Sequence, residues 1–142
     1  MLILLSFFVL SGCVQNDSMS QEIGPKIIYD SFNDQDCQHT NRTMFTLSKE
    51  TNVTDIYLWY HWSINETEVP FTILKDNTSI INHVLIRDNC EPFGSTWCNA
   101  TVFLNQTFPA GTFELKVQNR QLGMNSESSL LGFIRIFGVQ DS

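Results

Sequence analysis

A succession of short apolar runs separated by turn residues constrains the fold of this chain most strongly. The runs lie at 26–32, 42–47, 53–62, 69–74, 80–86, 101–104, 112–117 and 131–139. No window carries the long 3.6-residue stripe of an amphipathic helix. We therefore expect an all-β domain over residues 26–142, built as an antiparallel two-sheet β-sandwich of jelly-roll type with about eight strands.

Alternation within the runs predicts which side chains face the core. In 112–117 the apolar Phe113, Leu115 and Val117 alternate with charged residues, so we expect these three to point inward. The run 53–62 is apolar on both faces, as in a central strand, and we expect its Trp59 to lie in the core. A turn cluster at 75–78 predicts a hairpin between 69–74 and 80–86. Residues 118–130 are polar and are expected to form a loop.

The first residues are typical of an export signal. Residues 1–10 carry no charged side chain, and such a run is too short to cross a hydrocarbon core, which needs about 20 residues. The step Leu10-Ser11-Gly12-Cys13 resembles the lipobox of prokaryotic lipoproteins. That resemblance implies that residues 1–12 are a signal peptide, removed by cleavage before Cys13, whose sulfur then carries lipid. The alternative is a buried N-terminal strand with Cys13 in the core.

Under the lipoprotein interpretation, residues 13–25 form a flexible tether that ends in Gly24-Pro25. We expect the protein to be anchored to the cell membrane by its lipid and to face the exterior, or the periplasm in a bacterium. The net charge of −7, from 15 acidic and 8 basic residues, repels phosphate backbones and argues against a nucleic-acid partner.

Four cysteines are present, and Cys13 is assigned to the lipid. An exported chain meets an oxidising compartment, so we expect a disulfide between Cys90 and Cys98, which flank a loop containing Pro92 and Gly94. Cys37 is then the odd cysteine; it could instead pair with either of the others or lie buried as a small apolar residue. The spacings disfavour a zinc site, since neither C-x-x-C nor H-x-x-x-H occurs.

Asn-x-Ser/Thr sequons are over-represented. Seven occur, at Asn16, Asn41, Asn52, Asn65, Asn77, Asn99 and Asn105, whereas the composition alone predicts about two. We expect N-glycosylation, most readily at an archaeal cell surface. The alternative is compositional, because β proteins rich in turns use Asn and Thr heavily.

The residues that could support catalysis are sparse. The three histidines are His39, His61 and His83, and no G-x-S-x-G nucleophile motif is present. Cys37 and His39 lie two residues apart, a spacing that is common by chance. We therefore expect no enzymatic activity.

Two binding hypotheses remain. Asp30, Asp34 and Asp36 place oxygen ligands close together, which makes calcium a candidate cofactor, although an Asx-rich turn explains the same residues. Trp97, in the cysteine loop, and Trp62 are candidate exposed rings for binding the apolar faces of sugars.

The domain also resembles the pre-peptidase C-terminal type of extracellular β-sandwich module. The similar stretches are Phe45-Thr46-Leu47, the segment from Leu74-Lys75-Asp76 to Ile80, and the segment from Phe108 through Gly111 to Val117. This resemblance implies a sandwich fold and an accessory role without catalysis. We expect a structural or protein-contact role at the envelope, with a glycan or an envelope protein as partner; the alternative is a carbohydrate-binding module.

Overall fold

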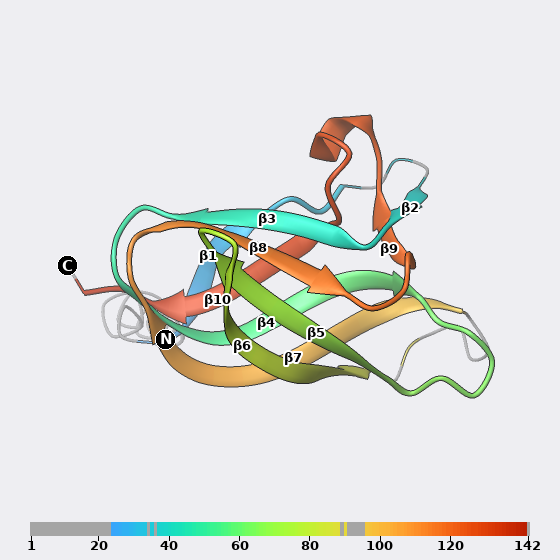
Figure 1. The fold of residues 1–142 in the computed structure, drawn as a ribbon, viewed down its shortest axis with the longest axis horizontal. Helices are drawn as coiled ribbons and strands as arrows, with labels where there is room; N and C mark the ends of the chain where they lie inside the picture. The colour runs from blue at the N-terminus through green and yellow to red at the C-terminus, as the bar shows by residue number, and fades with distance from the viewer. Residues whose placement is uncertain (1–23, 34, 36, 89, 91–95, 142) are drawn as a thin grey trace, which may run out of the picture.

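The computed structural model describes residues 24–141 apart from 34, 36, 89 and 91–95, and this part of the chain is almost entirely β-structure (Figure 1). The strands are β1 (Lys26–Asp30), β2 (Gln38–Thr40), β3 (Arg42–Leu47), β4 (Thr51–His61), β5 (Glu68–Lys75), β6 (Thr78–Arg87), β7 (Trp97–Phe108), β8 (Gly111–Val117), β9 (Leu122–Met124) and β10 (Ile134–Val139), with one 3₁₀ turn, η2 (Ser126–Ser128). The all-β prediction is confirmed. Across these described positions, no helix combines the length and apolar character needed to span a bilayer.

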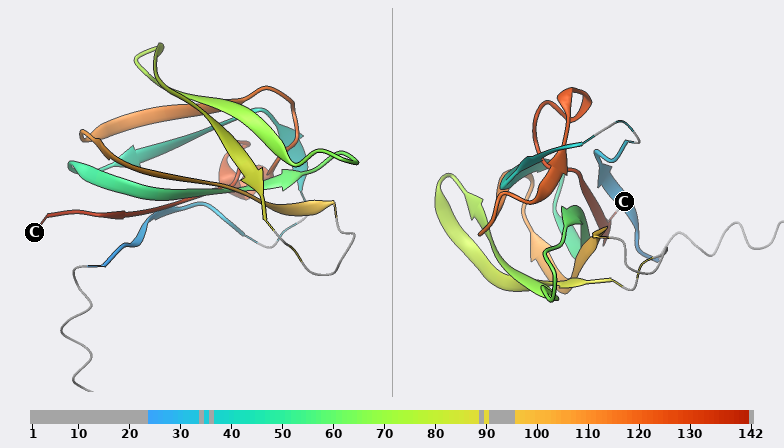
Figure 2. Two further views of the ribbon diagram at one scale, coloured as in Figure 1. Left: turned by 90° about the horizontal axis from the view of Figure 1, so that it is seen from below. Right: turned by 90° about the vertical axis from the view of Figure 1, so that its right-hand side faces the viewer.

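Hydrogen bonds join the strands into one antiparallel sheet in the order β1-β10-β4-β7-β6-β5-β8-β3, with β9 added to β4 and β2 to β9. A short ladder links β6 to β7, in which Ile86 and Arg87 lie opposite Thr101 and Ala100. The end strands β1 and β3 contact each other without a ladder. The sheet therefore curls around a single core into a nearly closed barrel (Figure 2), so that the two expected layers are continuous at the β6–β7 join.

A pair of hydrogen bonds joins the start of β3 to the segment just before β10 and helps to hold the curled sheet together. The Gly132 amide, just before β10, donates to the Arg42 carbonyl at 2.9 Å. The Thr43 hydroxyl donates to the Gly132 carbonyl, and Thr43 is fully buried. A buried hydroxyl costs free energy unless it is paired, so this bond makes Thr43 compatible with the core.

The core is filled by the inward positions of alternating strands. Ile56, Leu58 and Tyr60 of β4 are fully buried, and Phe113, Leu115 and Val117 of β8 point inward as predicted. Three phenylalanine rings, Phe45, Phe108 and Phe113, lie with centroids 5.2–6.3 Å apart. Each large apolar side chain buried in this way contributes about 1.5–3 kcal/mol of stability.

Tyr60 brings a hydroxyl to the edge of the core. Its Oη donates to Glu66 Oε2 at 2.9 Å, and Glu66 Oε1 accepts from the Ser63 amide and from Gln121 Nε2. Burial, with the Glu66 carboxylate adding to it, raises the pKa of Tyr60 well above its usual value. Tyr60 therefore remains a neutral phenol that donates to Glu66 and anchors the β4–β5 connection.

The predicted Cys90–Cys98 disulfide is formed, with Cα atoms 5.9 Å apart and Cys98 fully buried. Removing it in a Cys90→Ala/Cys98→Ala variant should lower the free energy of unfolding by about 2–3 kcal/mol, because the bridge restricts the unfolded chain. Urea unfolding of the natural chain with and without reductant measures this effect. The double variant is the control and should not respond to reductant. Identical unfolding midpoints for the oxidised and reduced natural chain would contradict the prediction.

Candidate functional site

The outer face of β10, β4 and β7 carries aromatic side chains that the core does not use. Along β4, Tyr57, Trp59 and His61 are half-buried and alternate with the fully buried inward residues. Tyr57 packs edge-to-face against Phe137 of β10, with ring centroids 5.3 Å apart. Phe103 of β7 is 67 % exposed. β4 is therefore apolar on both faces, as predicted, but Trp59 lies on the outer face and its assignment to the core was wrong.

Four rings gather at one end of this face, and we call Trp59, Trp97, His39 and His61 the aromatic cluster. Trp97 opens β7 directly opposite His61, and their rings lie 4.6 Å apart and 7° from parallel. His39 of β2 lies 5.4 Å from Trp97 at 17°, and Trp59 lies 6.0 Å from it at 11°. Nearly parallel rings at these separations make offset-stacked contacts.

Gly123 of β9 gives the aromatic cluster its space. A Cβ atom at Gly123 would lie 2.9 Å from Trp59 Cδ1, 3.1 Å from Trp97 Cζ3 and 3.3 Å from Cys37 Sγ. The two indole rings thus pack directly against the backbone of β9. A side chain at position 123 would prevent this contact. Because β9 pairs with both β2 and β4, it also brings His39 next to them.

A cavity of about 420 Å³ adjoins Trp59. Its lining combines two aromatic rings with three amides and a thiol: Phe32, Asn33, Gln35, Cys37, Trp59 and Asn99. Asn99 Oδ1 is buried and has no hydrogen-bond partner among the described residues, an unusual condition for a buried carbonyl oxygen. Amide groups beside an indole ring are the chemical groups that bind sugar hydroxyls and the apolar face of a pyranose.

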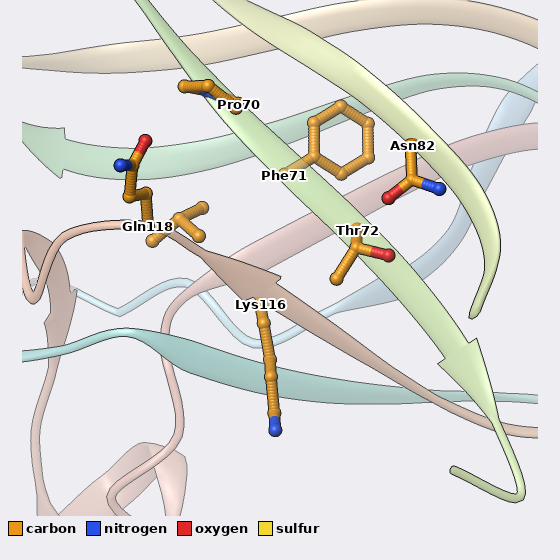
Figure 3. A pocket seen from close by; sticks show the side chains of 7 residues that line it. Pro70, Phe71, Thr72, Asn82, Lys116 and Gln118 are labelled. Carbon is orange, nitrogen blue, oxygen red and sulfur yellow. The ribbon is translucent and has the colours of Figure 1, made fainter. Parts of the chain in front are cut away.

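A second depression, of about 320 Å³, lies on β5, β6 and β8 (Figure 3). The Thr72 hydroxyl there is already bonded to Ser79 and to the Ile81 carbonyl. Figure 3 shows the Lys116 side chain extending away from Phe71 and Asn82. These polar groups do not converge on one point, so the depression is a weaker candidate than the cavity beside Trp59.

The two tryptophans predicted to bind ligands have different positions. Trp97 is half-buried within the aromatic cluster, and His61 covers part of its ring. Trp62 is 1 % exposed; its Nε1 donates to the Cys98 carbonyl at 3.1 Å and its ring packs 4.4 Å from Tyr60. Trp62 is therefore a core residue, and the prediction that it is exposed was wrong. It shares the inward parity of Leu58 and Tyr60, a signal already present in the sequence.

The acidic segment forms turns where it is described. Asp30 Oδ1 accepts the Phe32 amide at 3.0 Å, Asn33 Oδ1 accepts the Gln35 amide at 3.0 Å, and Asp30 Oδ2 pairs with Arg135 Nε at 3.0 Å. These are the Asx turns of the alternative hypothesis. Asp34 and Asp36 lie outside the described residues, so calcium binding stays a prediction. Within the described ranges, no group of three or more His, Cys, Asp or Glu side chains is placed to hold a metal ion.

The sequons differ in accessibility. Asn65, Asn77 and Asn105 are exposed and adopt positive φ angles of 67°, 65° and 50°. Asn52 is half-buried, and its Nδ2 donates to Asn105 Oδ1 at 2.9 Å. Asn41 and Asn99 are half-buried, whereas Asn16 and the lipidation candidate Cys13 lie outside the described residues. Glycosylation stays a prediction, and exposure favours Asn65, Asn77 and Asn105 as acceptors.

The histidines make few contacts that suit a nucleophilic mechanism. His39 Nε2 lies 3.0 Å from His61 Nδ1, and His61 Nε2 lies 3.0 Å from Thr96 Oγ1. His83 lies on β6, away from the other two histidines, and its Nδ1 accepts the amide of the next residue, Val84, at 2.8 Å. Among the described residues, no carboxylate hydrogen-bonds to any of the three rings, whereas a catalytic triad commonly orients its base in that way.

None of the known protein families, curated protein sequences or solved structures compared with this chain matches it.

Replacing Gly123 with Ala tests the packing of the aromatic cluster. We expect the free energy of unfolding to fall by about 1–3 kcal/mol, as is typical of overpacking, because the new methyl group meets both indoles. Thermal or urea unfolding measures the loss. The same change in a Trp59→Ala background is the control and should cost less. Equal losses in the two backgrounds would show that the Trp59 indole does not restrict the size of the residue at position 123.

Proposed function

We propose that this chain is an exported, lipid-anchored surface protein whose β domain is a non-catalytic binding module. The outer face of β10, β4 and β7 is its contact surface. The observation that carries the proposal is this second apolar face, present on strands whose inward residues already fill the core. Large exposed apolar patches on soluble domains commonly mark interaction sites.

The contact surface includes a row of residues across four strands. Strand register aligns Ile27 of β1, Phe137 of β10, Asp55 of β4 and Phe103 of β7. Ile27 is 50 % and Phe103 is 67 % exposed. Apolar and aromatic side chains of this kind form the anchors of protein interfaces. We infer that an envelope protein binds at this end of the face.

The cavity beside Trp59 favours a second candidate function, carbohydrate binding. Trp59 supplies an indole ring, and Asn99 supplies a carbonyl oxygen that lacks a partner among the described residues. The residues differ from those predicted from the sequence, because Trp62 is buried and Trp59 takes its place. A sugar hydroxyl that donated to Asn99 Oδ1 after a small side-chain rotation would remove the cost of the unpaired oxygen.

The anchor is tested by a Cys13→Ser change. If Cys13 carries lipid, the variant should leave the membrane fraction for the soluble fraction, since the polar tether that follows has little affinity for a bilayer. Immunoblots of fractionated cells measure the distribution. A Cys37→Ser variant is the matched control and should stay with the membrane. Membrane retention of Cys13→Ser equal to that of the natural chain would contradict lipidation.

Two substitutions on the contact surface separate the candidate functions. Phe103→Ser should abolish chemical cross-linking to a neighbouring envelope protein in intact cells, while Trp59→Ala should abolish binding to a glycan array. Lys116→Ala, on β8 in the other half of the sheet, is the control for both assays. The binding proposal fails if cross-linking and glycan binding are both absent from the natural chain, or if neither substitution changes them.

A further inference from the structure

Two histidines that are 22 positions apart in the sequence meet at their ring nitrogens. His39 Nε2 on β2 and His61 Nδ1 at the end of β4 lie 3.0 Å apart. A hydrogen bond between them requires a proton on one of these nitrogens and a lone pair on the other. When neither nitrogen is protonated, two lone pairs face the same small space, and imidazole lone pairs are the commonest metal ligands in proteins.

The surroundings orient both rings. The imidazoles of His39 and His61 are 23° from parallel to each other and within 17° of the Trp97 ring plane. His61 Nε2 lies 3.0 Å from Thr96 Oγ1. When Nε2 carries the proton and donates to Thr96, His61 Nδ1 presents its lone pair to His39. Outer partners of this kind commonly orient metal-binding histidines.

We propose that His39 and His61 form a two-histidine chelate for a divalent transition-metal ion, Cu²⁺ or Ni²⁺, with water in the remaining positions. Metal–nitrogen bonds of about 2.0–2.1 Å at a right angle place the two nitrogens about 2.9 Å apart, whereas a tetrahedral site needs about 3.3 Å. The observed 3.0 Å fits adjacent corners of a square-planar or octahedral site, which Cu²⁺ and Ni²⁺ adopt.

Binding requires both imidazoles to turn, so that nitrogens that now face each other converge on the ion, and it requires one proton of His39 to move. In the metal-free pair, His39 Nε2 donates to His61 Nδ1 when His61 carries its own proton on Nε2, where it donates to Thr96 Oγ1. On binding, the His39 proton moves to Nδ1 through solvent, and Nε2 coordinates the ion. The protons balance, because each imidazole remains neutral and keeps one proton. His39 is exposed, so water can solvate the Nδ1 proton.

Tryptophan fluorescence of the full chain in detergent, titrated with CuCl₂ or NiCl₂, tests the chelate. Trp97 lies next to both imidazoles, so we expect saturable quenching with a stoichiometry of one ion per chain. His39→Ala and His61→Ala should each raise the dissociation constant by about tenfold or more, since loss of even an outer-shell partner commonly costs 10- to 100-fold. His83→Ala is the matched control and should leave the constant unchanged.

A spectroscopic measurement keeps the test independent of how well the variants fold. Electron paramagnetic resonance of the natural chain with one equivalent of Cu²⁺ should show coupling to two imidazole nitrogens. Coupling to one nitrogen or none would overturn the proposal. Equal dissociation constants for the natural chain and folded His39→Ala or His61→Ala, or an equal loss in His83→Ala, would also overturn it. The assays for the binding function proposed above use Phe103 and Trp59, so a failure of the chelate is distinguishable from a failure of that function.

Discussion

Strand β4 lies between β10 and β7 along most of its length, so hydrogen bonds hold its backbone on both edges. That double pairing gives every side chain of β4 a defined face. Ile56, Leu58 and Tyr60 build the core, while Tyr57, Trp59 and His61 build the outer surface. The stability of the barrel and the geometry of the candidate site therefore depend on the same backbone, and a one-residue shift in register would exchange the two sets.

The long strands could be predicted from the sequence because they combine apolar runs with turn residues. The hairpin of β5 and β6 and the inward face of β8 follow the local pattern closely. β2 and β9 could not be predicted, since each has three residues and lies in a polar segment. β2 forms by pairing with β9, and β9 by pairing with β2 and β4, and no short window of sequence contains that information. The β6–β7 ladder, which makes the two expected layers one sheet, could not be predicted either, because it pairs residues of separate segments.

The candidate site could be predicted only in part. The aromatic run of β4 and the ring of Trp97 indicated a surface rich in aromatics. Which face each ring occupies depends on its alternation along β4, and Trp62, two residues after the inward residue Tyr60, lies on the same side as Tyr60. The approach of His39 to Trp97 depends on β2 and β9, and the space above Gly123 depends on three segments at once. The Cys90–Cys98 disulfide was predictable because two cysteines close in sequence flank a turn.

The β6–β7 join, where two residue pairs connect the halves of the sheet, has a mechanical consequence. Local openings of a folded protein begin where few hydrogen bonds must break. Here the segment after β6 also ties it to β7, because the Asp88 amide donates to the Asn99 carbonyl at 3.0 Å and Cys90 is bonded to Cys98. Reduction of that disulfide therefore leaves the β6–β7 join as the part of the wall expected to open first, while the ladders that β4 makes with β10, β7 and β9 stay intact.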